Sequence, residues 1–356
     1  MSEKIKILII DDSALVREAL KEVFSTDSEL EVIGMANDPY EAAKMLRTAV
    51  PDVITLDLQM PRMDGLTFLR KLMQQHPIPV VVISSLTQKG KESAMKALEY
   101  GAAEVLGKPR ISTSADFASS SEKLCHTVKA ASNARPSILK KPTPRTNPRD
   151  VDDTLPKHRI IRDSIIAIGA STGGTEAIKT VLQSMPSNGP GILIVQHMPA
   201  GFTHQFAMRL DRECPLAVKE AEDGDRVEPG RALIAPGNMH MYLRKSAGQY
   251  FVAVKEGSPV NRHMPSVDEL FFSVAKVAGK KALGVIMTGM GKDGAKGLLE
   301  MRKNGARTIA QDEKSSVVFG MPREAIHVGA AGHVESLTDI SPRLVSILKK
   351  DIEEES

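Results

Sequence analysis

The chain has 356 residues, 42% hydrophobic and 26% charged, which is typical of globular proteins and long enough for two hydrophobic cores. It contains no apolar run of about 18 residues, so membrane insertion is not expected. The opening sequence MSEKIKILII lacks a signal-peptide pattern, which predicts a cytoplasmic protein. The two cysteines, Cys125 and Cys214, share no CxxC or metal-ligand spacing, so neither a disulfide framework nor a zinc site is expected.

The formal net charge of +3 is unevenly distributed along the chain. Residues 123–160 hold nine Lys and Arg, three Asp and five Pro, without a periodic apolar pattern. This composition is typical of a solvated linker, here between two domains expected at residues 1–122 and 161–350. Neither interleaved aromatic residues nor a helix-turn-helix pattern accompanies the basic segment, so nucleic acid is not an expected partner.

Five apolar runs of strand length alternate with helical patterns in the first 120 residues. They cover residues 5–10, 31–36, 53–56, 79–85 and 103–107. Asp38 can cap a helix that opens at Pro39, and Gly101 can end the helix that begins near Lys91. Continuous Val, Ile and Leu strands joined by helical crossovers predict a parallel sheet covered on both faces, a flavodoxin-like (βα)5 fold.

Polar residues follow these strands at the points where they end. Asp11 and Asp12 end the first strand, Asp57 the third, Ser84 the fourth and Lys108 the fifth. The carboxyl ends of parallel strands meet at one edge of a sheet, so these side chains should lie together. Three carboxylates repel one another unless cations offset them, which predicts Mg²⁺ beside the lysine.

This constellation, with the loop DLQMPRMDG and the Lys-Pro step at residue 108, resembles the response-regulator receiver domains of two-component systems. The resemblance implies that Asp57 accepts a phosphoryl group from a histidine kinase. It implies further roles at the same edge: Mg²⁺ binding by Asp12, Asp57 and the backbone carbonyl of Gln59 with Asp11 assisting, a phosphate contact by Lys108, and a switch residue at Ser84.

A second series of strands and helices begins at residue 164 and predicts another mainly parallel, doubly wound α/β sheet. Its expected strands include SIIAIG, GILIVQ, RALIAPG, ALGVIMTG and RTIAQ, with a hairpin-like pair in MYLRKSAGQYFVAVKEG. Three of these strands end in polar or glycine-rich loops: GASTGG at 169–174, QHMP at 196–199 and TGMGKDG at 288–294.

Two of the loops allow more than one interpretation. GASTGG fits G-x-S-x-G, where a sharp turn presents Ser171 as a nucleophile, but for this loop alone the alternatives of an anion-binding turn or a plain tight turn are together equally compatible. A P-loop is excluded because Thr175 stands where lysine is required. TGMGKDG satisfies the dinucleotide pattern G-x-G-x-x-G, yet Asp293 would repel the pyrophosphate that such a turn binds.

Taken together, the three loops predict a catalytic triad. Ser171, His197 and Asp293 follow three strands of one parallel sheet and should share one rim. His197 would take the proton of Ser171, and Asp293 would fix the imidazole tautomer. The chain order Ser, His, Asp differs from that of α/β-hydrolases, so another fold is expected to carry this geometry.

GASTGG, IVQHMP, RHMPSVDELF and VIMTGMGKDG together resemble the chemotaxis receptor protein-glutamate methylesterase (CheB) family, and with the receiver the resemblance covers nearly the whole chain. It implies that Ser171 attacks glutamyl methyl esters of chemoreceptors, with deamidation of glutamine by the same acyl chemistry and no cofactor. Backbone N–H groups near the nucleophile turn and at Met290 would stabilise the oxyanion. Thr172, Met290 and residues 263–268 would line the substrate cleft.

The resemblance also implies regulation: the unphosphorylated receiver would restrict access to the hydrolase cleft, and phosphorylation of Asp57 would relieve this. We expect a monomer whose partners are chemoreceptors and a chemotaxis histidine kinase. The alternative is a receiver joined to a non-catalytic module that binds an anion or nucleotide. A cysteine-based deamidase is not expected, because Cys214 precedes Pro215 in a polar stretch without a motif partner.

Overall fold

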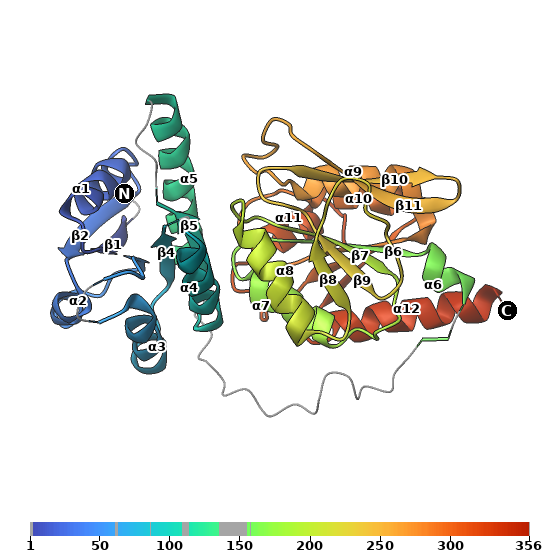
Figure 1. Ribbon diagram of the computed structural model, residues 1–356, viewed down its shortest axis with the longest axis horizontal. Helices are drawn as coiled ribbons and strands as arrows, with labels where there is room; N and C mark the ends of the chain where they lie inside the picture. Colours follow the sequence, from blue (N-terminus) through green and yellow to red (C-terminus); the bar gives the residue numbers. More distant parts are fainter. Residues whose placement is uncertain are drawn as a thin grey trace. The chain divides into compact units, whose positions relative to one another are not determined.

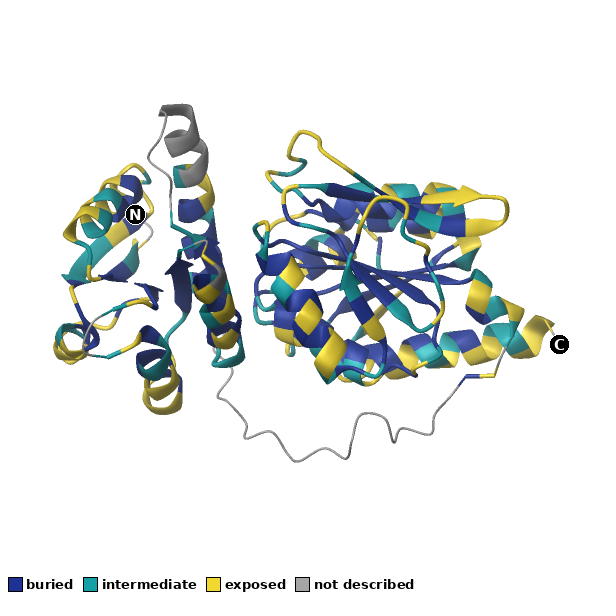
Figure 2. Cartoon of the chain, viewed as in Figure 1, coloured by how far each residue is buried: buried dark blue, intermediate teal, exposed yellow. Residues whose placement is uncertain are grey.

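The computed structural model describes residues 3–60, 63–85, 87–108, 114–134, 155–156 and 158–355. The chain divides into two units, Met1–Thr143 and Pro144–Ser356, each with its own sheet (Figure 1). In both units the central strands are buried, whereas many helices alternate buried and exposed residues along their length (Figure 2). Among the described residues, no helix has the length and apolar character that crossing a membrane requires.

The N-terminal unit is a five-stranded parallel sheet with strand order β2-β1-β3-β4-β5. Its strands are β1 (Ile5–Ile10), β2 (Leu30–Ala36), β3 (Val53–Leu56), β4 (Val80–Ser84) and β5 (Glu104–Gly107). Its helices are α1 (Ala14–Ser25), α2 (Pro39–Met45), α3 (Gly65–Gln75), α4 (Gln88–Glu99) and α5 (Ser114–Ser132). The predicted (βα)5 fold is confirmed, since each strand leads through a helix to the next parallel strand.

Helix starts in this unit follow side-chain capping. Asp38 accepts hydrogen bonds from the backbone N–H groups of Tyr40 and Glu41, which confirms the expected cap at Pro39. Ser13, Asp64 and Thr87 cap three further helices in the same way. The loops that carry Asp11 and Asp57 therefore lead into helices with fixed starting points.

Helix α5 corrects the predicted linker boundary. It continues to Ser132, ten residues beyond residue 122, and buries Leu124, Val128 and Ala131 on one face. The helical spacing of these residues was hidden because lysine, histidine and small polar residues lie between them. The rest of the basic segment lies largely outside the described residues. At the other end, α12 (Ile340–Glu355) includes the acidic residues that the sequence analysis left beyond residue 350.

The C-terminal unit contains a seven-stranded parallel sheet with strand order β14-β13-β12-β6-β7-β9-β8. Its strands are β6 (Ile165–Ala170), β7 (Gly191–Gln196), β8 (Ala217–Glu220), β9 (Arg231–Ile234), β12 (Ala282–Ile286), β13 (Arg307–Gln311) and β14 (His333–Glu335). An antiparallel hairpin is separate from it: β10 (His240–Ser246) and β11 (Gln249–Lys255). The sheet extends to both sides of β6, with β7, β9 and β8 on one side and β12, β13 and β14 on the other, as in the predicted doubly wound arrangement.

Helices cover both faces of this sheet. They are α6 (Arg159–Asp163), α7 (Gly174–Gln183), α8 (Phe202–Glu213), α9 (Val267–Ala278), α10 (Ala295–Lys303), α11 (Met321–His327), α12 and the short 3₁₀ helix η2 (Gly279–Lys281). Helices α9 and α10 pack together, with the β10–β11 hairpin against α9, while α7 packs against α8 and α12. The loops after β6, β7 and β12, three neighbouring strands, consequently meet at one edge of the sheet.

Candidate active site

Ser171 lies in the loop between β6 and α7, where its backbone is held by neighbouring loops. Its N–H donates to the carbonyl of Thr288 at 2.9 Å, and its own carbonyl accepts from Gly174 N–H at 2.7 Å and Gln196 Nε2 at 2.9 Å. The loops after β6, β7 and β12 are thereby tied together around the serine. Its hydroxyl makes no hydrogen bond to any residue that the structure describes.

Two glycines allow the loops to approach Ser171 closely. A Cβ on Gly289 would lie 2.8 Å from the Cβ of Ser171, so only glycine fits there. Gly173 has a φ of 78° and caps the start of α7, and a Cβ on it would meet the side chain of Val317 at 2.5 Å. The G-x-S-x-G pattern therefore corresponds to a sharp turn that packs closely against the loops of Gly289 and Val317.

His197 follows β7 and points one ring nitrogen at Asp293. His197 Nε2 lies 2.8 Å from Asp293 Oδ2, and the histidine is only 9% exposed. Its Nδ1 is buried and has no partner among the described residues. The proton therefore belongs on Nε2, and Nδ1 presents a free lone pair. No hydrogen bond joins Ser171 to His197, a contact that in catalytic sites often tightens only when substrate binds.

Asp293 is buried, yet its surroundings favour the charged form. Besides His197 it accepts hydrogen bonds from Asn261 Nδ2 and Ser266 Oγ at 2.8 Å, and from the backbone N–H groups of Val267 at 2.7 Å and Asp268 at 3.2 Å. Burial alone would raise the pKa of Asp293, but its hydrogen bonds, that from His197 first, hold the pKa well below its usual value. Three of the donors lie at the start of α9, where the helix dipole also favours an anion.

This environment decides against the dinucleotide interpretation of TGMGKDG. Asp293 occupies the turn and faces the start of α9, where it takes the donors that a phosphate would need. Gly294, with a φ of 87°, lets the turn approach α9 so closely that a Cβ would lie 2.5 Å from Val267 Cγ1. The glycines serve close packing of a carboxylate against a helix.

The predicted oxyanion and cleft residues have different surroundings. Met290 is half-buried, and no described residue accepts a hydrogen bond from its N–H. Thr172 is buried, and its carbonyl accepts from the hydroxyl of Thr288 at 2.9 Å. Within residues 263–268, Ser266, Val267 and Asp268 are buried and donate hydrogen bonds to Asp293. A helix start needs such buried donors, which the sequence pattern does not reveal.

Sequence reasoning missed several residues that hold the predicted triad residues in place. Asn261 donates to both Asp293 and Asp268 at 2.8 Å, and Gln196 ties the histidine loop to the serine loop. Beneath the site, the side chain of Gln311 accepts from Thr288 N–H at 2.8 Å. Asn and Gln at strand and loop ends are common, so only their three-dimensional neighbours identify these roles.

The receiver residues also come together, at the carboxyl edge of the N-terminal sheet. Lys108 Nζ lies 2.7 Å from Asp57 Oδ2 and 2.9 Å from Asp11 Oδ2. Burial raises the pKa of Asp11, against the opposing effect of its hydrogen bond with Lys108. Ser84 is buried and donates to the carbonyl of Gly90 at 3.2 Å, while Gln59 N–H donates to Asp57 Oδ1 at 3.2 Å.

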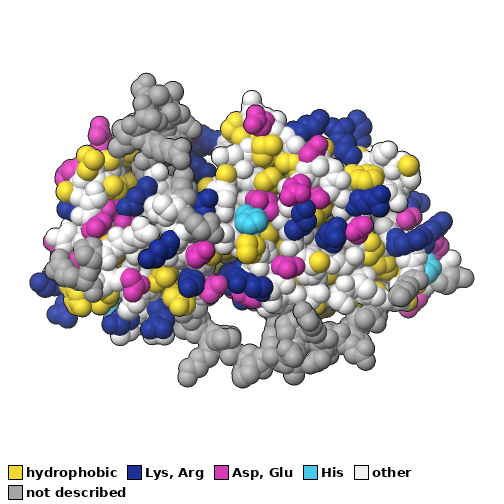
Figure 3. Space-filling view, in the orientation of Figure 1, with side chains coloured by type: hydrophobic (Ala, Val, Ile, Leu, Met, Phe, Trp, Pro, Cys, Tyr) yellow, Lys and Arg dark blue, Asp and Glu magenta, His cyan; other side chains and the backbone are white. Residues whose placement is uncertain are grey.

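The surroundings of Cys214 favour its protonated thiol. Burial, and next the negative charge of Glu213, raise the pKa of Cys214 to about 12, so its thiol stays protonated near neutral pH. Both cysteines are free and buried. Acidic and basic side chains are interspersed over much of the face in Figure 3.

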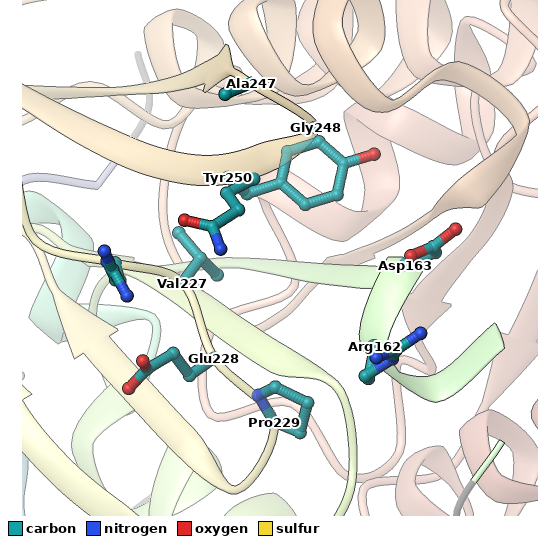
Figure 4. Close-up of a pocket in the computed structure, with 10 residues that line it drawn as sticks. Arg162, Asp163, Val227, Glu228, Pro229, Ala247, Gly248 and Tyr250 are labelled. Carbon is teal, nitrogen blue, oxygen red and sulfur yellow. The ribbon is translucent and has the colours of Figure 1, made fainter. Parts of the chain in front are cut away.

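A cavity of about 330 Å³ is lined by residues that do not include Ser171, His197 or Asp293; Figure 4 shows its lining. Its walls come from Arg162 and Asp163 before β6, the loop before β9, and the turn of the β10–β11 hairpin around Gly248. The first two walls lie at the amino ends of parallel strands, the sheet edge opposite the loops of Ser171 and His197, and the third belongs to the separate hairpin. The cavity therefore takes no part in the triad.

Comparison with known proteins agrees with this geometry. Residues 166–344 match the family model for CheB methylesterase, and residues 7–114 match that for the response regulator receiver domain. The protein-glutamate methylesterase/protein-glutamine glutaminase 5 of Anaeromyxobacter dehalogenans is 54% identical over 351 residues, covering 97% of each chain. A protein of the same kind from Geobacter metallireducens is 51% identical over 97% of this chain and 99% of its own. The solved catalytic domain of Thermotoga maritima CheB methylesterase is 41% identical, covers 52% of this chain and 98% of its own, and superposes with a TM-score of 0.51.

Proposed function

The chain belongs to the CheB methylesterase family, and from this premise we propose that it hydrolyses glutamyl methyl esters, and deamidates glutamines, on chemoreceptors under control of its receiver. The observation that carries the proposal is the buried, charged Asp293 bound to a histidine whose other nitrogen is free, on the same rim as Ser171. A binding module has no need of this arrangement. The alternative of a non-catalytic anion or nucleotide module is not supported by the family matches.

Acylation starts at Ser171. Its Oγ attacks the ester carbonyl carbon while its proton moves to Nδ1 of His197, and Asp293 stabilises the resulting imidazolium through Nε2–H. Collapse of the tetrahedral intermediate breaks the C–O bond to the methoxy group, which leaves as methanol with the proton from Nδ1. A glutamyl ester on Ser171 remains.

Deacylation reverses the same proton path. Water attacks the acyl carbon and gives a proton to Nδ1 of His197, which returns it to Ser171 Oγ as the glutamate leaves. With a glutamine substrate, ammonia takes the place of methanol in the first half. The proposed oxyanion donor is the N–H of Met290, in the loop after β12, which donates to no residue that the structure describes. One such donor typically stabilises the transition state by about 3 kcal/mol. Thr172, which follows Ser171 in the same loop, is proposed to line the substrate cleft.

The receiver is the proposed control element, with Asp57 as the phosphorylation site and a histidine kinase as donor. Asp11, Asp12 and Asp57 each offer a carboxylate oxygen, all within 4.8 Å of one another, a donor set that fits Mg²⁺. Asp12, Asp57 and the backbone carbonyl of Gln59 would hold it with Asp11 assisting, and the ion would offset phosphoryl charge. Lys108 would then contact the phosphate, and Ser84 would leave Gly90 to do the same.

Two labelling experiments test these assignments. We expect a fluorophosphonate to modify Ser171 in the wild type, to block methanol release from methyl-labelled chemoreceptor membranes in proportion, and to leave Ser171→Ala unmodified. Modification elsewhere, with methanol release intact, would contradict the nucleophile assignment. In the receiver, labelled acetyl phosphate should label the wild type, whereas label on Asp57→Asn would remove Asp57 from its role.

A further inference from the structure

His263 lies against the proposed catalytic base. Its ring stacks on that of His197, with centroids 3.7 Å apart and planes inclined by only 11°. His197 comes from the end of β7, whereas His263 comes from the loop before α9. The stack therefore joins two segments that are far apart in the chain, and it covers a face of the His197 ring, whereas the hydrogen bond to Asp293 lies at the ring edge.

The loop of His263 is connected to the same carboxylate. His263 Nδ1 lies 2.7 Å from the carbonyl of Asn261, and the side chain of Asn261 donates to Asp293 Oδ1 at 2.8 Å. Asp293 Oδ2 in turn contacts His197. The contacts form a closed circuit of four residues, in which Asn261 takes part through both its backbone carbonyl and its side chain.

The backbone of this loop adopts an unusual conformation to complete the circuit. Asn261 has a φ of 50° and Arg262 a φ of 69°, so two consecutive residues other than glycine are left-handed. This conformation is unfavourable for such residues and persists where surrounding contacts determine it. The chain thus bends sharply to bring His263 over His197.

One hydrogen bond does not fix the plane of His197. Nε2 lies close to the axis of the Cβ–Cγ bond, so rotation about that bond moves Nε2 little while it turns Nδ1 through a wide arc. The intrinsic torsional preference of histidine about this bond is broad, so it does not fix the ring plane either. A flat partner against the ring face restricts this rotation directly.

We propose that His263 is a positioning residue, whose stacked ring fixes the plane of His197 so that Nδ1 is aimed at Ser171. The inference deepens the proposed function and rests on it. The role requires a flat ring at residue 263, and it requires no proton transfer by His263.

A shared metal ion explains the cluster less well. His197, His263 and Asp293 each offer a ligand atom within 4.8 Å of the others. However, Nε2 of His197 already contacts Asp293, and Nδ1 of His263 contacts Asn261. Ring nitrogens coordinate in the plane of the ring, and two nearly parallel stacked planes do not converge on one ion.

The test compares full-length variants, with phosphodonor present, on methyl-labelled chemoreceptor membranes. His263→Phe keeps a flat ring, and His263→Leu and His263→Gln do not. We expect His263→Phe to retain kcat within about threefold, and the two others to lose about 10- to 100-fold in kcat with KM changed less than about twofold. The rate at which a fluorophosphonate modifies Ser171 should fall in the same two variants and stay close to wild type in His263→Phe. This reaction needs His197 but no receptor, so it reports on the base alone.

Thermal unfolding of each variant shows whether a loss of activity comes from a loss of stability. Two non-aromatic variants are used so that a comparison remains if one of them does not fold. Equal losses in Phe, Leu and Gln would overturn the inference, because a nitrogen of His263 would then be needed. Full activity in Leu or Gln, or a change confined to KM, would also overturn it. Absence of methanol release by the wild type would instead overturn the proposed function, and the inference with it.

Discussion

Asp293 shows how single residues set the chemistry of this site. A carboxylate in the interior is costly unless donors surround it, and here five hydrogen bonds do so. Its neighbour Asp268 accepts hydrogen bonds from Asn261 Nδ2 and from Gly297 N–H, and burial raises the pKa of Asp268. Two adjacent buried aspartates thus differ in protonation tendency because the donors are unequally shared between them.

Replacing Asp293 by Asn should lower kcat by about 10³- to 10⁴-fold with little change in KM, because an amide no longer stabilises the imidazolium. Asp268→Asn is the matched control, since this buried aspartate makes no hydrogen bond or ion pair with His197, and its loss of kcat should be far smaller. Methanol release at saturating receptor measures both. Similar losses in the two variants would contradict the role of Asp293.

The lowered pKa of Asp293 also predicts a pH dependence of stability. The native state favours the charged form, so this contribution is fully present above the unfolded pKa of about 3.9 and is lost as pH falls through the lower native pKa. The difference in thermal midpoint between wild type and Asp293→Asn should therefore not shrink between pH 8 and about pH 5, and it should shrink only in stronger acid. A difference that already shrinks between pH 7 and 5 would be inconsistent with this.

At the scale of elements, the strand-end loops carry the site, and glycine controls how closely they pack. Gly291 and Gly294 have the same φ of 87°, but only Gly294 faces another element, α9. Gly291→Ala should lower the free energy of unfolding by about 1 kcal/mol, and Gly294→Ala by about 3 kcal/mol because its Cβ also meets Val267. Denaturant unfolding measures both, and equal effects would show that the approach to α9 is not tight.

Sequence patterns predicted the elements that have long apolar runs. The strands before Asp57, Ser171 and His197 are buried Val, Ile and Leu runs, and the strand-end rule placed their loops at common edges. Short β8 and β14 were missed because they are partly exposed and lack such runs. The orientation of His197, with Nε2 rather than Nδ1 toward Asp293, depends on the path of the loop around Asn261, which no periodicity reports.

At the scale of the whole molecule, two units share one chain, and phosphorylation in one must change the free energy of states of the other to regulate it. If the receiver restrains the hydrolase, deletion of residues 1–143 should raise basal methanol release severalfold and abolish its response to acetyl phosphate. The comparison is with the full chain at equal concentration. A truncated protein no faster than the unphosphorylated full chain would argue against restraint.

The central claim is that one chain couples phosphorylation of Asp57 to hydrolysis at Ser171. The measurement that tests it most directly is methanol release from methyl-labelled chemoreceptor membranes, with and without acetyl phosphate and Mg²⁺, by wild type, Asp57→Asn and Ser171→Ala. We predict that phosphodonor accelerates the wild type, that Asp57→Asn stays at the basal rate, and that Ser171→Ala releases none. Methanol release by Ser171→Ala, or equal acceleration of Asp57→Asn, would contradict the account.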